Sequence, residues 1–455
     1  MSFSTSPARS PFLMVSMQAR YAGRVKKPCA RLSADRPDRG RSESVERGSP
    51  EPSLVSRRSL FVSLCGMVFL VNLARIVFAP LLEPLKAAFA VGDGAVGLLA
   101  TLAWVGSALP RIPVGYLLTR LRRRTVVLGS GLLLTGAAAL AAAAPTIEWL
   151  YAGALGMGLA SGAYFIAGNP LVSELFPDRV GAALGVHGGA SQVAAVLAAP
   201  LVGVVLAGVL ADPLSWEPWR TVLRAIALAA AASTLVLWWV SRWTTLPEAG
   251  AEDRDLLGAA RRQWRIVLAG VAFIGATGFV YNGVFNFYVT YLVQAKGLGA
   301  PAARNLLTLL FLAGLPAFVV SGRLADRLPN VPYVLAIGGA FAGCLLALTA
   351  VSGVVALALA SAAMGWVIHS LFPAMDTYLL DGLPDENRAS AYAVYSGTMM
   401  LIQATGSVTV GTLREAGYGF DVLYSTLAGG LVVFVLVLVA LYLDGRLPAG
   451  GVPAR

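Results

Sequence analysis

Long, uninterrupted blocks of apolar residues constrain this chain more than any other feature. The block from Thr125 to Ala144 contains no charged residue, and about twelve blocks of similar character follow residue 58. A helix of roughly 20 apolar residues is long enough to cross the hydrocarbon core of a bilayer. The chain is 57% hydrophobic and only 13% charged, which is unusual for a soluble domain. We therefore predict an all-α membrane protein with about twelve transmembrane helices.

The predicted spans form two bundles of six, separated by a polar central loop over residues 242–263. Residues 1–56 are basic and rich in Ser, Pro and Arg, so we expect a disordered tail there, and residues 446–455 form a second tail. The N-terminal bundle, residues 57–241, has spans near 59–82, 95–118, 125–144, 147–171, 181–210 and 220–241. The C-terminal bundle, residues 264–445, has spans near 265–293, 303–325, 331–350, 353–378, 389–412 and 420–443.

The distribution of positive charge predicts the orientation of these spans. The net charge is +11, and more than half of it lies in residues 1–59, so the rest of the chain carries no basic surface typical of a nucleic-acid-binding protein. Most of the other lysine and arginine residues fall in loops on the same side as the central loop. The positive-inside rule then places both termini in the cytoplasm and the chain in the cell (inner) membrane. We expect the lipid bilayer to surround the helices.

Two short motifs occur twice at the same spacing. GYLLTR begins at Gly115 and GRLADR at Gly322, which lie 207 residues apart. The dipeptides at Pro177 and Pro384 are also 207 residues apart. A shared offset over two distant motifs indicates a duplicated six-helix unit, which predicts two pseudo-symmetric bundles related by an axis along the membrane normal.

These motifs resemble those of the major facilitator superfamily, and the resemblance covers residues from about 57 to 445. It rests on GYLLTRLRRR and GRLADRLPN, and on the paired loops PDRVGAALG and PDENRASAY. It implies a monomeric secondary transporter whose cytoplasmic loops link the halves and change partners during transport. The first loop departs from the family pattern, because Thr119 stands where an aspartate is expected. The implied loop residues are Gly115, Thr119, Arg120, Gly322, Asp326 and Arg327.

Two arginines interrupt apolar segments, where an ionisable group is costly and is kept mostly for function. Arg75 lies mid-helix with Asn72 three residues before it, so the two share a helical face. Arg111, in LPRIPVG, resembles an anion-binding arginine in the second helix of nitrate/nitrite porters. Those porters use a second arginine at the position that is Phe318 here, which argues against nitrate. A guanidinium suits carboxylate or phosphate, so both arginines are predicted to bind an anion.

Other polar residues inside the spans are weaker candidates. Tyr281, Asn282 and Asn286 lie in an aromatic seventh span, and Tyr164 lies in the fourth. We expect these four residues to contact the solute. Asp376 and His369 are seven residues apart in the tenth span and therefore share a face. Both can carry a proton, so they are predicted to couple transport to protons. Helix packing or ion pairing is the alternative role for each of these residues.

The sequence predicts a transporter of a small solute, an anion moved with protons by alternating access. The first alternative is a proton-driven exporter of drug-like molecules or metabolites. The second alternative is a non-transporting membrane sensor on the same scaffold, with the basic tail as its signalling segment. The chain contains no HExxH motif and no phosphate-binding P-loop, and its three cysteines have no metal spacing. We therefore expect no enzymatic activity, no metal and no cofactor.

Overall fold

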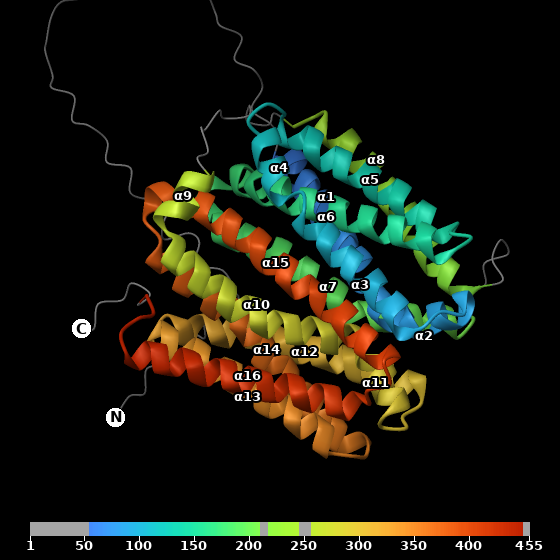
Figure 1. Ribbon diagram of the computed structural model, residues 1–455. Helices are drawn as coiled ribbons and strands as arrows, with labels where there is room; N and C mark the ends of the chain where they lie inside the picture. The colour runs from blue at the N-terminus through green and yellow to red at the C-terminus, as the bar shows by residue number, and fades with distance from the viewer. Residues whose placement is uncertain (1–53, 210–216, 245–255, 449–455) are drawn as a thin grey trace, which may run out of the picture.

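The computed structural model describes residues 54–209, 217–244 and 256–448, and throughout these residues it is helical with no strand (Figure 1). Residues 1–53 of the predicted tail and residues 245–255, half of the predicted central loop, lie outside the described residues. Figure 1 shows the first half, in blue and green, at the upper right and the second half, in yellow to red, at the lower left, with α15 running alongside α3 and α7. The predicted all-α membrane fold is confirmed.

The helices follow the predicted spans closely. Those of the first half are α1 (Leu54–Ile76), α2 (Phe78–Phe89), α3 (Asp93–Ala108), α4 (Arg111–Leu117), α5 (Arg123–Ala142), α6 (Ile147–Leu175), the 3-10 turn η1 (Pro177–Arg179), α7 (Val180–Leu206) and α8 (Pro218–Ser241). Those of the second half are α9 (Leu256–Arg262), α10 (Trp264–Asn286), α11 (Tyr288–Gln294), α12 (Ala300–Ala325), α13 (Asn330–Ala350), α14 (Val354–Gly382), α15 (Asp385–Glu415) and α16 (Phe420–Leu443).

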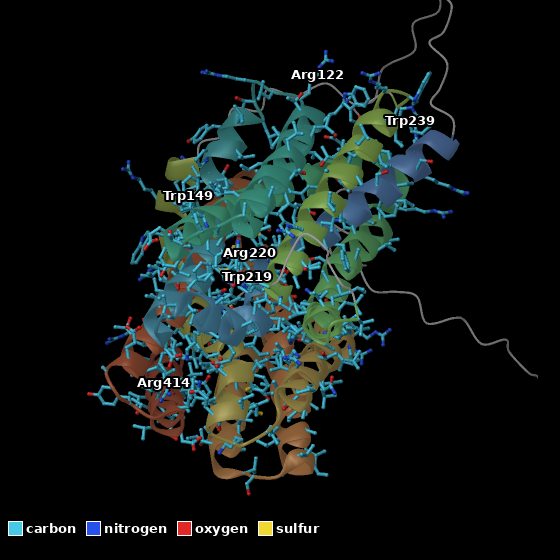
Figure 2. All side chains as sticks on the ribbon, turned by 90° about the vertical axis from the view of Figure 1, so that its right-hand side faces the viewer. Arg122, Trp149, Trp219, Arg220, Trp239 and Arg414 are labelled. Carbon is cyan, nitrogen blue, oxygen red and sulfur yellow. The ribbon has the colours of Figure 1, made fainter. Side chains whose placement is uncertain are left out.

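Within the described residues, 11 helical segments are long and apolar enough to cross a membrane. The remaining long helix, α15, coincides with the predicted span at 389–412 and is richer in Ser, Thr and Gln. The outer surface of the bundle is apolar, as a lipid-facing surface must be. Val355 is 74% exposed and Leu228 is 72% exposed. Figure 2 shows Trp149 and Trp239 at the edge of the bundle, directed away from it.

Prolines divide the first two spans, which the sequence analysis predicted as continuous segments. The first span breaks at Val77 into α1 and α2, three residues before Pro80. A proline has no N–H and its ring clashes with the carbonyl four residues earlier, here that of Ile76. Pro110 and Pro113 act in the same way between α3 and α4. Each break interrupts the regular helix, so side chains next to it can point toward the interior of the bundle.

The predicted repeat is visible in the helix bounds. α6 and α14 are offset by 207 residues at both ends, and α5 and α13 by 207 at their starts. In the first half, α3 and α7 pack against the second half, and their counterparts there are α12 and α15. The halves meet through α3 against α15 and α7 against α12, which is the pairing that a two-fold pseudo-axis requires.

Small residues allow α3 and α15 to pack closely. A Cβ on Gly97 would lie 2.6 Å from the backbone oxygen of Ser407, and one on Gly411 would lie 2.4 Å from that of Asp93. Thr101 Oγ1 donates to the carbonyl of Ala404 at 2.9 Å across the same contact. Glycine at such crossings lets two backbones approach within van der Waals distance.

A polar network closes this end of the molecule, where α2 and α11 lie. Asp93 accepts a hydrogen bond from Lys86 Nζ at 2.5 Å and lies 3.4 Å from Arg414 Nε of the other half. Gln294 donates to Glu83 at 3.2 Å, and Arg414 donates to Gln294 at 3.2 Å. The two halves are therefore held together at the α2 end by both packing and charge.

We expect Gly97→Val to destabilise the protein by about 1–3 kcal/mol, because the new side chain would overlap the α15 backbone. Thermal unfolding in detergent should show a lower melting temperature. Gly129→Val on α5 is the matched control, since a Cβ there meets no heavy atom within 4 Å. Equal melting temperatures for the two variants would contradict the close packing of α3 on α15.

Candidate functional site

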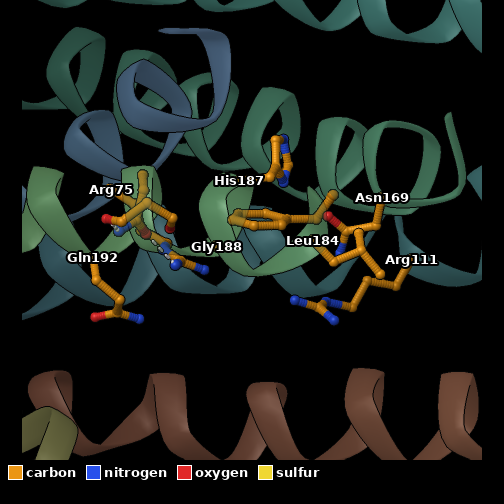
Figure 3. A pocket seen from close by; sticks show the side chains of 10 residues that line it. Arg75, Arg111, Asn169, Leu184, His187, Gly188 and Gln192 are labelled. Carbon is orange, nitrogen blue, oxygen red and sulfur yellow. Dashed lines mark hydrogen bonds between the residues drawn. The ribbon is translucent and has the colours of Figure 1, made fainter. Parts of the chain in front are cut away.

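A cavity of about 330 Å³ lies within the first half, between α1, α4, α6 and α7. Figure 3 shows Arg75, Arg111 and Gln192 extending from the first half toward a helix of the second half. Its volume suits a small organic or inorganic solute. The lining residues are Asn72, Arg75, Arg111, Phe165, Asn169, Leu184, His187, Gly188, Ser191 and Gln192.

Arg75 lies in the last turn of α1, beside the break at Val77. Its Nη2 donates to Asn72 Oδ1 at 2.5 Å, and Asn72 in turn donates to the carbonyl of Ser191 at 2.7 Å. The guanidinium also lies 4.3 Å from the ring centroid of Trp104, a cation–π distance. Its Nε is buried and has no hydrogen-bond partner within the described residues. Arg75 is thus held in place by Asn72 and Trp104, while its Nε stays without a partner among these residues.

Arg111 is the first residue of α4, at the second proline break. Its Nη1 donates to Ser396 Oγ of α15, so it reaches from the first half to the second. Its Nε donates to the carbonyl of Ser107 at 3.4 Å. The hydroxyl of the same Ser107 accepts a hydrogen bond from Arg75 Nη1 at 3.2 Å. One serine therefore links the two arginines.

The charge of these two arginines is not balanced locally. Neither forms a salt bridge with a carboxylate in the described part of the chain, and no acidic residue lines the cavity. The two guanidinium groups lie close enough to repel each other electrostatically. Insertion of one arginine at the centre of a membrane helix costs about 2.5–3.5 kcal/mol even on the most lenient scales. Two such groups facing one cavity, with no acidic residue in its described lining, give the cavity a net positive charge.

One face of α7 supplies half of the lining, and the sequence pointed to only one residue of this face, Gln192, as a weaker candidate for facing the cavity. Leu184, His187, Gly188, Ser191 and Gln192 follow the i, i+3, i+4, i+7, i+8 pattern of a single helical stripe. The signal that could have identified this stripe is its polarity within an otherwise apolar helix. Asn169 and Phe165 on α6 complete the wall.

Tyr164 lies behind this wall and does not line the cavity in the described structure. Its hydroxyl donates to the carbonyl of Leu64 at 2.7 Å and lies 2.9 Å from Nε2 of His187. The Tyr164 and His187 rings are stacked, with centroids 5.8 Å apart. Tyr164 therefore reaches the cavity only through His187.

The predicted residues of the seventh span lie elsewhere. Asn286 donates to Asn282 Oδ1 at 2.8 Å and to Ser407 Oγ at 2.8 Å, in the packing of α10 against α15. Tyr281 stacks on Phe285 at 5.7 Å. None of the three predicted residues lines the cavity described here.

The two predicted proton carriers have different surroundings. Asp376 accepts a hydrogen bond from the Tyr392 hydroxyl at 2.8 Å, and Tyr392 is near enough to Arg111 for the two to interact electrostatically. His369 is buried, and its Nδ1 lies 2.8 Å from the carbonyl of Gly365. Aromatic rings surround it, and those rings belong to Tyr281, Phe311, Phe318 and Phe372. Asp376 is thus connected to the cavity through Tyr392, whereas His369 belongs to an aromatic cluster.

The predicted loop residues lie at the end of the molecule opposite to α2. A Cβ on Gly115 or Gly322 would meet no heavy atom within 4 Å. Thr119 Oγ1 donates to the carbonyl of Tyr116 at 2.7 Å. The other three loop residues, Arg120, Asp326 and Arg327, are exposed. An ion pair that the sequence analysis did not predict, Arg123 with Glu174, joins α5 to α6 at this end.

Comparison with known proteins identifies this architecture. A family model described as Major Facilitator Superfamily matches residues 64–355 and 297–454. A bacterial homologue of the human lysosomal transporter Spinster, in an inward-facing and occupied conformation, has a TM-score of 0.69 at 18% identity, over 88% of this chain and 100% of that chain. The D-xylose–proton symporter gives 0.68 at 16% identity, over 88% and 99%. The nucleoside transporter NupG gives 0.69 at 15% identity, over 84% and 100%. At these identities the likeness concerns the fold alone.

The test uses a variant in which the three cysteines of the chain are replaced by serine and Gly188 is replaced by cysteine. We expect this cysteine to react with a water-soluble, anionic methanethiosulfonate reagent. A Cβ at Gly188 meets no heavy atom within 4 Å and faces the cavity. The two arginines should make the anionic reagent react several times faster than its cationic analogue. Gly189→Cys, equally open but outside the lining, is the control. The same reagent preference at both positions would contradict a positive cavity.

Proposed function

Because the chain belongs to the major facilitator superfamily, it is a multi-pass secondary transporter of a small solute, and we propose that this solute is an anion moved together with protons. The observation that carries the proposal is the pair of unbalanced guanidinium groups, Arg75 and Arg111, at one cavity. A buried cation without a carboxylate partner is costly, and an entering anion removes that cost. A cationic solute would increase this electrostatic cost.

The remaining lining favours an anion with a polar or aromatic body. Asn169 and Gln192 offer amide hydrogen bonds, whereas Phe165 and Leu184 offer apolar contact. A guanidinium binds a carboxylate through two parallel hydrogen bonds, which gives direction as well as affinity. Arg75 keeps Nε free of hydrogen bonds within the described residues. A small carboxylate that accepts from the Nη donors of Arg75 or Arg111 suits this lining.

Alternating access follows from the way the halves meet. The Gly97 and Asp93 contacts close the α2 end, while Gly115 and Gly322 at the other end have no close neighbours. With the termini in the cytoplasm, the α2 end is extracellular and this conformation faces inward. Arg111 crosses between the halves to Ser396, so an anion that takes over this donor also changes the contact between the halves. Binding is thereby linked to rocking.

We expect Arg75→Gln and Arg111→Gln each to weaken anion uptake roughly ten- to a hundredfold, because hydrogen bonds to charged groups contribute about 1.5–3 kcal/mol. Uptake of radiolabelled nitrate, sulfate, benzoate and succinate into proteoliposomes gives the measurement. Arg446→Gln is the control, since its side chain is 73% exposed and far along the chain from the cavity. Wild-type uptake of ethidium or of neutral sugars, with none of the four anions transported, would instead support the exporter alternative. Absence of any transport would support the sensor.

Asp376 is the residue that we propose to carry the coupling proton in the second half. Its hydrogen bond from Tyr392 connects it toward Arg111. Asp376→Asn keeps the size and the acceptor oxygen but cannot exchange a proton. We expect an inwardly directed proton gradient to stimulate uptake severalfold in the wild type and more weakly in this variant. Stimulation of Asp376→Asn equal to that of the wild type would exclude Asp376 as a coupling group.

A further inference from the structure

A hydrogen-bond chain behind the cavity fixes the proton on His187. The carbonyl of Leu64 can only accept, and it lies 2.7 Å from the Tyr164 hydroxyl, so that hydroxyl donates to it. The hydroxyl has one proton, and that proton is now used. His187 Nε2, 2.9 Å from the same hydroxyl oxygen, must therefore be the donor in the second bond. The ring carries its proton on Nε2 and keeps Nδ1 as an unprotonated acceptor.

Nδ1 of His187 has no hydrogen-bond partner among the described residues, although the side chain lines the cavity. The charged and titratable groups near it come from three helices. α1 presents Arg75 to the cavity and Cys65 to Tyr164, α4 presents Arg111, and α6 presents Tyr164 itself. On α12, which also packs against α7, Arg304 lies beside Gly203, more than four turns away from His187. No carboxylate lines the cavity.

We infer that His187 takes up a proton on Nδ1 when an anion enters the cavity, and that this protonated imidazolium is a third cation of the anion site. In the empty site, Arg75 and Arg111 repel any further positive charge, so the ring stays neutral. An anion between the two arginines cancels that repulsion and offers an acceptor for the new N–H. A hydronium ion from the water on the side to which the cavity opens supplies the proton: its O–H bond breaks as the Nδ1–H bond forms, and a water molecule is left.

This inference rests on the proposed anion transport and deepens it. By linkage, if the anion favours protonation of His187, then protonation favours anion binding by the same factor. The coupling would then arise inside the substrate site, in addition to any proton carried by Asp376. Tyr164 would act as a positioning residue, because it sets which ring nitrogen remains open.

His369 provides an internal comparison. Its Nδ1 lies 2.8 Å from the carbonyl of Gly365, which can only accept, so Nδ1 carries the proton there. The ring lies among Tyr281, Phe311 and Phe318 and does not line the cavity. The two histidines therefore have opposite tautomers, and they are the only histidines in the sequence.

The experiment is nitrogen NMR of the full chain labelled with [¹⁵N]histidine, at neutral pH, with and without saturating nitrate, sulfate, benzoate or succinate. His369→Gln assigns the two ring systems. We expect the Nδ1 resonance of His187 to change from an unprotonated to a protonated nitrogen with the anion that binds, while His369 keeps its neutral signals. A His187 ring that stays neutral in an anion-saturated sample overturns the inference.

Calorimetry separates this inference from the proposed function. Titration of the same four anions in two buffers of different ionisation enthalpy gives the number of protons taken up on binding. We expect proton uptake by the wild type and by Asp376→Asn, and less by His187→Gln, whose anion affinity should also depend less on pH. Binding of an anion with equal proton uptake in His187→Gln overturns the inference and leaves the proposed function intact. If none of the four anions binds, the proposed function fails as well.

Discussion

The partial burial of two guanidinium groups inside a membrane-spanning bundle is the constraint on which the site depends. Water cannot solvate them fully there, so the fold must supply substitutes. Ser107 accepts hydrogen bonds from both arginines. Asn72 and Trp104 contact Arg75. Ser396 accepts a hydrogen bond from Arg111 across the interface between the halves. These contacts hold the arginines in position but add no negative charge. The positive cavity that remains is the basis for the proposed transport of an anion.

The two halves have the same arrangement of helices, but the residues at equivalent positions of the site differ. The position that matches Arg75 at the repeat offset is Asn282, and the position that matches Arg111 is Phe318. Asn282 is satisfied by Asn286 and Ser407, and Phe318 packs on His369. The first half therefore supplies the cavity and its charge. The second half closes over it and contributes Ser396, and Asp376 through Tyr392.

Some of this arrangement could be predicted from the sequence, and the reason is the bilayer. Spans, repeat and both arginines were predictable because an apolar solvent penalises every polar exception. The prolines that break the first two spans were also visible, but the spans were predicted to be continuous. Asn282, Asn286 and Tyr281 are equally polar exceptions, yet they are buried in α10 packing away from the cavity. Polarity inside a span does not tell which face points inward.

The sequence alone determined that the chain crosses a membrane about twelve times, that its halves are repeats, and that Arg75 and Arg111 are buried charges, because each follows from local composition and spacing. Only the tertiary structure decided which polar residues share a cavity. The stripe that includes His187 and Gln192 on α7 joins the arginines because helices that are distant in sequence pack side by side. The proton on His187 is likewise fixed by a carbonyl and a hydroxyl from two other helices. Such relations depend on three-dimensional contacts between distant segments, which no local pattern encodes.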